Sequence, residues 1–187
     1  MKEHLGVKNC LYPMPVVIVG SLVNGRPNYL TIAHVGIMDF THVSISSAKS
    51  HYSNKGIEEN GTFSVNIPGT DLVERTDYVG IVSGGEVDKS GVFTPFYGEL
   101  KTAPMIEECP INMECRLERT VEFPKHLVFI GEIVATYCNE ELLEGDSINF
   151  VRLDPILYIH ENRGYWSIGH RFAEAWNVGK NFRKRQI

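Results

Sequence analysis

The chain has 187 residues, a formal net charge of −5 and a hydrophobic fraction of 43%. These values fit one domain with a single core, and they exclude a disordered chain and a disulfide-rich scaffold. The mild negative charge argues against nucleic acid as a partner, because duplex binding depends on neutralising phosphates. No apolar run approaches the roughly 20 residues of a membrane helix, and we find no signal peptide, so we expect a soluble cytoplasmic protein with no membrane partner.

Strand patterns dominate the chain. The first strand is the buried run 16–20, and an Asn24-Gly25 turn connects it to a second strand over 28–33. The alternation of polar and apolar residues and two further buried runs predict strands over 42–47, 63–67, 113–118, 127–134 and 156–159.

A short helix is predicted over 52–60, with Ser50 or Ser53 as its N-cap. Gly61 follows this segment and supplies the C-terminal stop. If Ser53 opens the helix, unpaired backbone N–H groups and the helix dipole lie beside its hydroxyl.

Asp71 and Glu74 have capping-box spacing and predict a second helix over 72–78, which Gly80 ends. The segment 83–91 that follows is typical of a loop. Helices are too few for a doubly wound sheet. We therefore expect one mainly β domain over 1–187, a closed barrel with a few short helices.

Cysteine and histidine spacing predicts neither zinc nor an iron–sulfur cluster, because CxxC and HExxH are both absent. Cys115 falls on the apolar face of its predicted strand, which indicates a buried core thiol. No nucleophile motif or phosphate-binding glycine loop is present either. An enzyme without its own acid, base or nucleophile usually depends on a cofactor.

Small hydroxylated residues, amides and lysines gather at strand ends and turns. They include Asn28, Thr31, Ser46, Ser47, the run Lys49-Ser50-His51-Tyr52-Ser53, Ser83 and Lys89. Such groups donate hydrogen bonds to phosphate oxygens, although serine and threonine at turns are mostly structural. Composition alone leaves both interpretations open.

The order of several short motifs resembles the flavin reductase-like FMN-binding split barrels, and among them the flavoredoxin group. The resemblance covers roughly residues 10–165. Its pieces are 13–20, 25–33, 43–46, Tyr52-Ser53, 57–60, 63–68, 71–73, Asp77, Gly80, Ser83-Gly84, Asp88-Lys89 and 131–134. It implies a Greek-key split β-barrel and a homodimer that holds one FMN per subunit near the subunit boundary.

The resemblance also implies positions for the cofactor. Asn28, Thr31 and Ala33 would lie along the flavin ring and the ribityl chain. The phosphate would be surrounded by Ser46, Ser53 and Lys89, with Ser83 and Gly84 supporting that loop. Each of these residues also has a structural reading, such as a turn cap, a strand position or a solvated lysine. Where many relatives carry Tyr-Thr this chain has Tyr52-Ser53, which keeps the hydroxyl.

No catalytic side chain is expected, since flavin N5 accepts the hydride or the electrons. The resemblance implies an FMN-dependent oxidoreductase that uses NAD(P)H, or an electron carrier between protein partners. The alternative is a split-barrel binding module without catalysis, holding haem or a deazaflavin. Haem would need a ligand in the barrel cleft, for which His34 and His42 are the candidates.

The segment from about 160 to 187 is expected to be a C-terminal extension. Its aromatic residues Tyr165, Trp166, Phe172 and Trp176 would pack in the core, at an interface or over the flavin. His170 and Arg171 could reach the phosphates of a nicotinamide nucleotide. A final basic cluster is either a solvated tail or a phosphate or partner contact: Lys180, Arg183, Lys184 and Arg185.

Overall fold

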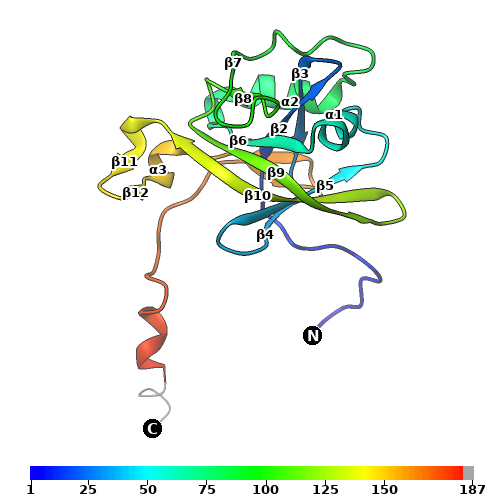
Figure 1. Ribbon diagram of the computed structural model, residues 1–187. Coiled ribbons are helices and arrows are strands. Elements are labelled where there is room, and N and C mark those ends of the chain that lie inside the picture. Colours follow the sequence, from blue (N-terminus) through cyan, green and yellow to red (C-terminus); the bar gives the residue numbers. More distant parts are fainter. Residues whose placement is uncertain (183–187) are drawn as a thin grey trace.

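The computed structural model describes residues 1–182 and is mainly β (Figure 1). Its centre is one curled antiparallel sheet of seven strands in the order β3-β2-β6-β9-β10-β5-β4. The strands are β2 (Val17–Val23), β3 (Arg26–Ile32), β4 (Val35–Ile37), β5 (His42–Ala48), β6 (Thr62–Ile67), β9 (Ile111–Glu122) and β10 (His126–Cys138). This is the expected split β-barrel.

Short elements surround the central sheet. A three-stranded sheet is formed by β1 (Met14–Pro15), β13 (Leu157–Ile159) and β14 (Gly164–Trp166), and two pairs by β7 (Pro95–Phe96) with β8 (Met105–Ile106) and β11 (Leu143–Glu144) with β12 (Ser147–Ile148). The helices are α1 (Ser53–Asn60), α2 (Val73–Ile81) and α3 (Phe150–Leu153), with 3₁₀ turns at Thr70–Leu72, Glu140–Leu142 and Val178–Asn181.

Strand β2 is buried on both faces, which explains its continuous apolar sequence. Val17 and Val19 face the barrel interior, in the cluster that contains Phe129. Ile18 faces the other way, into a second cluster with Val79 of α2. Helix α1 packs on β2 and α2 packs on β3, so the β2–β3 hairpin lies between the two helices (Figure 1).

The Asn24-Gly25 turn is confirmed. Both residues have positive φ, 52° and 73°, as the tight turn of a two-residue hairpin requires. Cys115 is also buried as expected, inside β9. The longer β9 and β10 include the predicted strands 113–118 and 127–134.

The helix caps differ from the sequence prediction. Helix α1 begins at Ser53, its N-cap position is Tyr52, and no side chain caps it, so neither Ser50 nor Ser53 does so. Tertiary contacts occupy Ser53 instead, because its hydroxyl accepts a hydrogen bond from Asn28. Gly61 ends the helix as expected, in the left-handed region at φ 64°.

The predicted capping box of Asp71 and Glu74 is also wrong. Asp71 lies in a 3₁₀ turn, and α2 begins only at Val73, without a side-chain cap. The helix passes Gly80 and ends at Ile81. The extra turn places the carbonyl end of α2 against the loop that contains Lys89.

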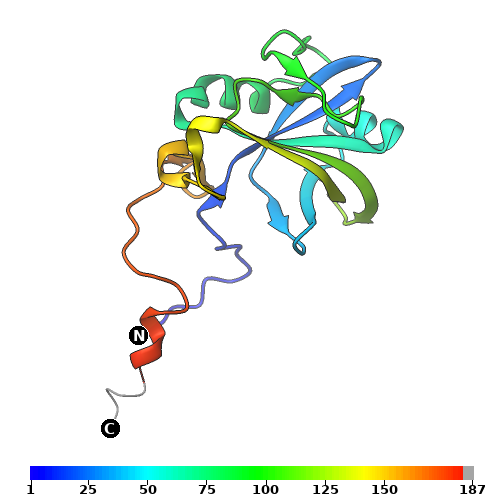
Figure 2. The same ribbon diagram turned by 60° about the vertical axis from the view of Figure 1, so that its left-hand side comes forward.

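Both chain ends leave the barrel on the same side (Figures 1 and 2). Residues 1–11 are exposed throughout, and so are nearly all of residues 165–180. Several large apolar side chains in these segments have little protein around them.

Candidate functional site

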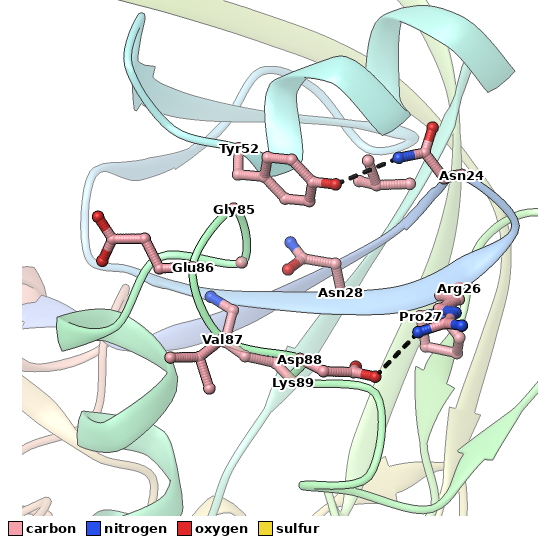
Figure 3. A pocket seen from close by; sticks show the side chains of 12 residues that line it. Asn24, Arg26, Pro27, Asn28, Tyr52, Gly85, Glu86, Val87, Asp88 and Lys89 are labelled. Carbon is pink, nitrogen blue, oxygen red and sulfur yellow. Dashed lines mark hydrogen bonds and ion pairs between the residues drawn. The ribbon is translucent and has the colours of Figure 1, made fainter.

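Three adjoining cavities lie in a row beside strand β3. The hairpin cavity, about 420 Å³, lies between the β2–β3 hairpin and the loop 84–89 (Figure 3). The central cavity, about 220 Å³, is lined by the start of α1 and by residues 80–84. The tyrosine cavity, about 340 Å³, is lined by Thr31, Ala33, Tyr158 and Tyr165. Shared lining residues connect the row: Tyr52, Gly84 and Lys89 at one junction, Gly80 and Ile81 at the other.

Lys89 stands at the junction of the hairpin and central cavities and is only 3% exposed. Its Nζ donates to the carbonyl oxygens of Val79, at 3.0 Å, and Val82, at 3.1 Å. These carbonyls belong to the last turn of α2 and its C-cap, where the helix dipole is negative. Burial lowers the pKa of Lys89 to about 8, so the group is still charged at neutral pH.

The Lys89 ammonium has no carboxylate partner among residues 1–182. An ammonium carries three donors, and the two backbone carbonyls use two of them. A buried charge is costly unless it is paired. The arrangement therefore fits an anion that enters the cavity and accepts a hydrogen bond from the third N–H of the ammonium.

Ser53 supplies a second donor to the central cavity. Its hydroxyl accepts a hydrogen bond from Nδ2 of Asn28 at 2.6 Å, which leaves the hydroxyl proton available. The Ser53 carbonyl accepts from the Ser21 hydroxyl at 3.1 Å. Both Ser53 and Asn28 are buried, so the helix start is held rigidly against β2 and β3. The Asn54 and Lys55 N–H groups donate to the carbonyl oxygens of His51 and Tyr52, at 3.2 and 3.3 Å, so the Ser53 hydroxyl is the donor that this helix start offers.

The loop after α2 approaches these residues closely at Gly84. A Cβ there would lie 2.0 Å from Oδ1 of Asn28 and 2.8 Å from Cδ1 of Tyr52, so only glycine fits. Ser83 lines the central cavity, and its Oγ accepts from the backbone N–H of Gly85 at 3.3 Å. Both residues therefore lie in the loop beside the Ser53–Asn28 bond, and their role toward a phosphate stays a prediction.

Thr31 and Ala33 lie in the tyrosine cavity. The Thr31 hydroxyl donates to the carbonyl oxygen of Thr76 in α2, so it is engaged by the protein. The Tyr165 hydroxyl donates to Oδ1 of Asp77 at 2.7 Å and fixes β14 against α2. Burial, then Asp77, raises the pKa of Tyr165. With Val16 and Ile81, these side chains make the least polar slot of the row.

Ser46 is the one predicted site residue that the structure does not bring to this row. It lies on β5, and none of the three cavities includes it in its lining. Its backbone N–H donates to the carbonyl oxygen of His34 at 2.8 Å. The remaining seven residues, Asn28, Thr31, Ala33, Ser53, Ser83, Gly84 and Lys89, all line the row.

His51 and Tyr158 also line the row, and no sequence pattern predicts a definite role for either. Nδ1 of His51 lies 2.9 Å from the Ser47 hydroxyl. Burial, then the charges of His126 and Lys89, lowers the pKa of His51. His51 directly precedes the Tyr52-Ser53 pair, so its place beside the site could be predicted from the sequence. Tyr158 comes from a distant strand, and no local pattern indicates its place.

The two histidines considered for haem do not line the row of cavities. Both ring nitrogens of His42 are engaged, at 2.9 Å by Asp39 and 2.8 Å by Glu118. These carboxylates, Asp39 first, raise the pKa of His42. His34 is exposed and packs edge-on against His126 at 6.2 Å between ring centroids. Neither geometry resembles a haem ligand in an apolar slot.

The C-terminal residues divide into two groups. Tyr165 joins the tyrosine cavity, whereas Trp166, Phe172 and Trp176 are exposed. None of the three cavities has His170 or Arg171 in its lining. Lys180 is exposed, and the other members of the basic cluster, Arg183, Lys184 and Arg185, lie outside the described residues.

Residues 1–182 contain neither a membrane-spanning helix nor a cluster of metal-ligating side chains. No helix within this range is both long and apolar enough to cross a membrane. In the same range, no three histidine, cysteine, aspartate or glutamate side chains are placed together to hold a metal ion.

Comparison with known proteins agrees with this geometry. Residues 9–167 match the family model described as "Flavin reductase like domain". The flavoredoxin from Methanosarcina acetivorans is 42% identical, with a TM-score of 0.93 over 97% of this chain and 100% of that one. The flavoredoxin of Desulfovibrio vulgaris (Miyazaki F) is 34% identical, with a TM-score of 0.88 over 96% and 100%.

A curated relative covers a similar extent. An uncharacterized protein from Archaeoglobus fulgidus is 28% identical over 184 residues, which are 96% of this chain and 93% of that protein. The family model and the two flavoredoxin structures support a flavin cofactor. Because the family model spans most of its length, the chain belongs to the flavin reductase-like family.

Proposed function

We propose that the protein is an FMN-dependent redox protein of the flavoredoxin type. It passes hydride or electrons through bound FMN, from NAD(P)H or a protein donor to an acceptor. The observation that carries the proposal is the buried Lys89 ammonium, which has a free donor and no carboxylate partner among the described residues.

The properties of the cavities favour one orientation of FMN along the row. The phosphate suits the central cavity, where the Lys89 ammonium and the Ser53 hydroxyl supply donors. The flavin ring suits the tyrosine cavity, whose walls of Val16, Ile81 and Tyr158 are the least polar. The ribityl chain then runs along β3 between them. This direction is consistent with Thr31 and Ala33 on the ring side and Lys89 on the phosphate side. Asn28, which was assigned with Thr31 and Ala33, lines the hairpin cavity instead and donates to Ser53.

The protein's part in the reaction is to bind and orient. FMN, when bound, supplies the electron-accepting centre. Tyr165 and Asp77 hold the wall of the tyrosine cavity in place through their hydrogen bond. Lys89 and Ser53 fix the phosphate end, and the packing of Gly84 on Asn28 fixes the loop. No side chain that would transfer a proton is required for this role.

A second copy of the chain completes the proposal. Exposed aromatic side chains gather in the terminal segment and in the loop before β5: Phe40 at 105%, Phe172 at 92%, Trp176 at 95% and Phe182 at 65%. Aromatic side chains bury 150–250 Å² each when covered, so they are typical of interfaces. A homodimer would cover them, and light scattering at micromolar concentration should give twice the chain mass.

The first experiment is an absorbance spectrum of the purified protein before and after dithionite. Flavin bands that bleach on reduction support the proposal. A colourless protein that takes up no added FMN contradicts it, and a Soret band would indicate haem instead. Oxidation of NADH and NADPH with the FMN-loaded protein then separates the two versions, because a pure electron carrier shows negligible turnover.

A further inference from the structure

Arg163 lines the tyrosine cavity and has no part in the function proposed above. It lies in the turn between β13 and β14, where its backbone N–H donates to the carbonyl oxygen of His160 at 3.2 Å. Its guanidinium forms no ion pair within residues 1–182. Asp77, the other charged residue of the lining, accepts from the Tyr165 hydroxyl at 2.7 Å. An exposed arginine without a carboxylate partner in the described chain thus borders the slot that suits the flavin ring.

The backbone conformation of Arg163 is one that arginine rarely adopts. Its φ is 52°, in the left-handed region, where the Cβ of an L-residue crowds the following carbonyl oxygen. Asn24 and Asp154 share this region, but their short polar side chains are common there. Glycine would take the position without steric cost. Folding alone therefore does not favour arginine at this turn, and such outliers cluster at ligand sites.

We propose, resting on the function proposed above, that Arg163 stabilises the reduced flavin ring and thereby raises the midpoint potential of bound FMN. Transfer of a hydride from NAD(P)H gives the ring two electrons and one proton, at N5, and releases NAD(P)⁺. A protein donor supplies the same two electrons, and the proton then comes from water. In both cases the ring gains one negative charge, shared by N1 and O2 of its pyrimidine edge. A guanidinium at this edge binds the anion more strongly than the neutral oxidised ring, and this difference raises the potential.

The lining of the tyrosine cavity favours the pyrimidine edge as the part of the ring beside Arg163. The dimethylbenzene end of the ring is apolar and suits Val16 and Ile81. The pyrimidine edge carries carbonyl oxygens, which accept hydrogen bonds, and one N–H, which donates. Arg163 has donors for the oxygens, and Asp77 is an acceptor for the N–H. One cation and one carboxylate therefore match this edge, whereas a phosphate, which has only acceptors, would be repelled by Asp77.

The test measures the midpoint potential of bound FMN by equilibration with a reference dye. Arg163→Asn removes the charge and keeps a residue that tolerates the left-handed region. We expect the affinity for the reduced ring to fall about tenfold relative to that for the oxidised ring, which lowers the potential by about 30 mV. Arg163→Lys keeps the charge and should stay within about twofold, or about 10 mV, of the wild type. The affinity of both variants for oxidised FMN should change by less than about twofold.

Two controls separate the charge of Arg163 from effects on the fold and on net charge. Arg163→Gly should lower the potential as Arg163→Asn does. The urea midpoint of its apoprotein should stay equal or rise, because glycine relieves the strained backbone. Arg119→Asn should leave the potential unchanged, since Arg119 is exposed on β9 and lines none of the three cavities.

The failure of this inference and that of the proposed function are distinguishable. An unchanged potential in Arg163→Asn and Arg163→Gly overturns the inference and leaves the proposed function intact. An equal drop in Arg163→Lys would assign the effect to shape, and an equal drop in Arg119→Asn would assign it to net charge, so either result also overturns the inference. Failure of the wild type to bind FMN overturns both.

Arg163 also has the charge to hold an anionic group of the electron donor, such as a phosphate of NADH. The KM for NADH of FMN-loaded Arg163→Asn separates the two roles. We expect it to stay within about twofold of the wild-type value. A KM raised about tenfold with an unchanged potential would assign Arg163 to the donor and overturn the proposal.

Discussion

Two groups of buried polar side chains differ in how completely the protein satisfies them. Asn66 on β6 donates to the Ile18 carbonyl at 2.8 Å and to the Ser64 hydroxyl at 2.9 Å. Its Oδ1 accepts from the Ile106 N–H at 3.1 Å and from Asn112 at 2.9 Å. Lys89 is as deeply buried, but it uses two of its three donors and meets no carboxylate in the described chain.

The difference separates a structural polar group from a binding one. The Asn66 side chain joins β2, β6, β8 and β9, and its four hydrogen bonds leave it no capacity for a ligand. The Lys89 ammonium is held in position by α2 while one donor remains available at the border of two cavities. Burial alone therefore does not distinguish a structural polar group from a ligand-binding one. The unused donor of Lys89 does, and it marks the candidate binding site.

Asn66→Ala should have the largest effect, on stability. It removes a hydrogen bond from three buried groups: the Ile18 carbonyl, the Ile106 N–H and the Asn112 amide, which keeps only its bond to the Ile106 carbonyl. Each such group costs about 1–3 kcal/mol, so the free energy of unfolding should fall by about 4 kcal/mol. Urea denaturation of the apoprotein measures this change, with the exposed Asn162→Ala as control. A loss below about 1 kcal/mol would show that the cluster contributes little to the stability of the sheet.

Lys89→Met should lower the affinity for FMN instead of the stability of the fold. It removes one charge-assisted bond to the FMN phosphate, which weakens binding by about 2 kcal/mol, or about thirtyfold. The free energy of unfolding should change little, because removal of an unpaired buried charge offsets the lost bonds to the Val79 and Val82 carbonyls. Lys101→Met is the matched control, since Lys101 is an exposed lysine that donates to the carbonyl of Gly98. Equal FMN affinity in both variants would place the phosphate elsewhere.

The pH dependence of FMN binding should depend on the same ammonium. Lys89 is charged below its lowered pKa of about 8 and loses its proton as the pH rises through that value. A bound phosphate favours the charged form, so FMN affinity should fall about tenfold between pH 7 and pH 9. Lys89→Met should bind FMN equally over this range. A wild-type affinity independent of pH would mean that Lys89 does not face the phosphate.

Much of the fold could be predicted because its signals are local. The Asn24-Gly25 turn needs only two residues with positive φ, and the alternation around Cys115 shows which face is buried. The helix caps were wrong because distant residues compete for the same side chains. Ser53 is bound by Asn28, and Asp71 lies in a 3₁₀ turn before α2.

Only part of the candidate site could be predicted from the sequence, because several of its residues are far apart along the chain and meet only through tertiary packing. Seven of the eight assigned residues line the row of cavities. The anchoring of Lys89 depends on where α2 ends, which the sequence placed too early. Tyr158 and Asp77 are far apart in sequence and meet in one cavity wall only through the packing of β13 and β14 beside α2.

Ser46→Ala should have the smallest effect, and it tests the one assigned residue that lies apart. The backbone bond from Ser46 to His34 does not involve the side chain, so alanine keeps it. FMN affinity and the free energy of unfolding should both stay within about 0.5 kcal/mol of the wild type. In the double variant with Lys89→Met, the loss of FMN affinity should equal that of Lys89→Met alone. A larger loss in the double variant would return Ser46 to the phosphate, and since the row within one chain excludes it, a second copy would have to bring it there.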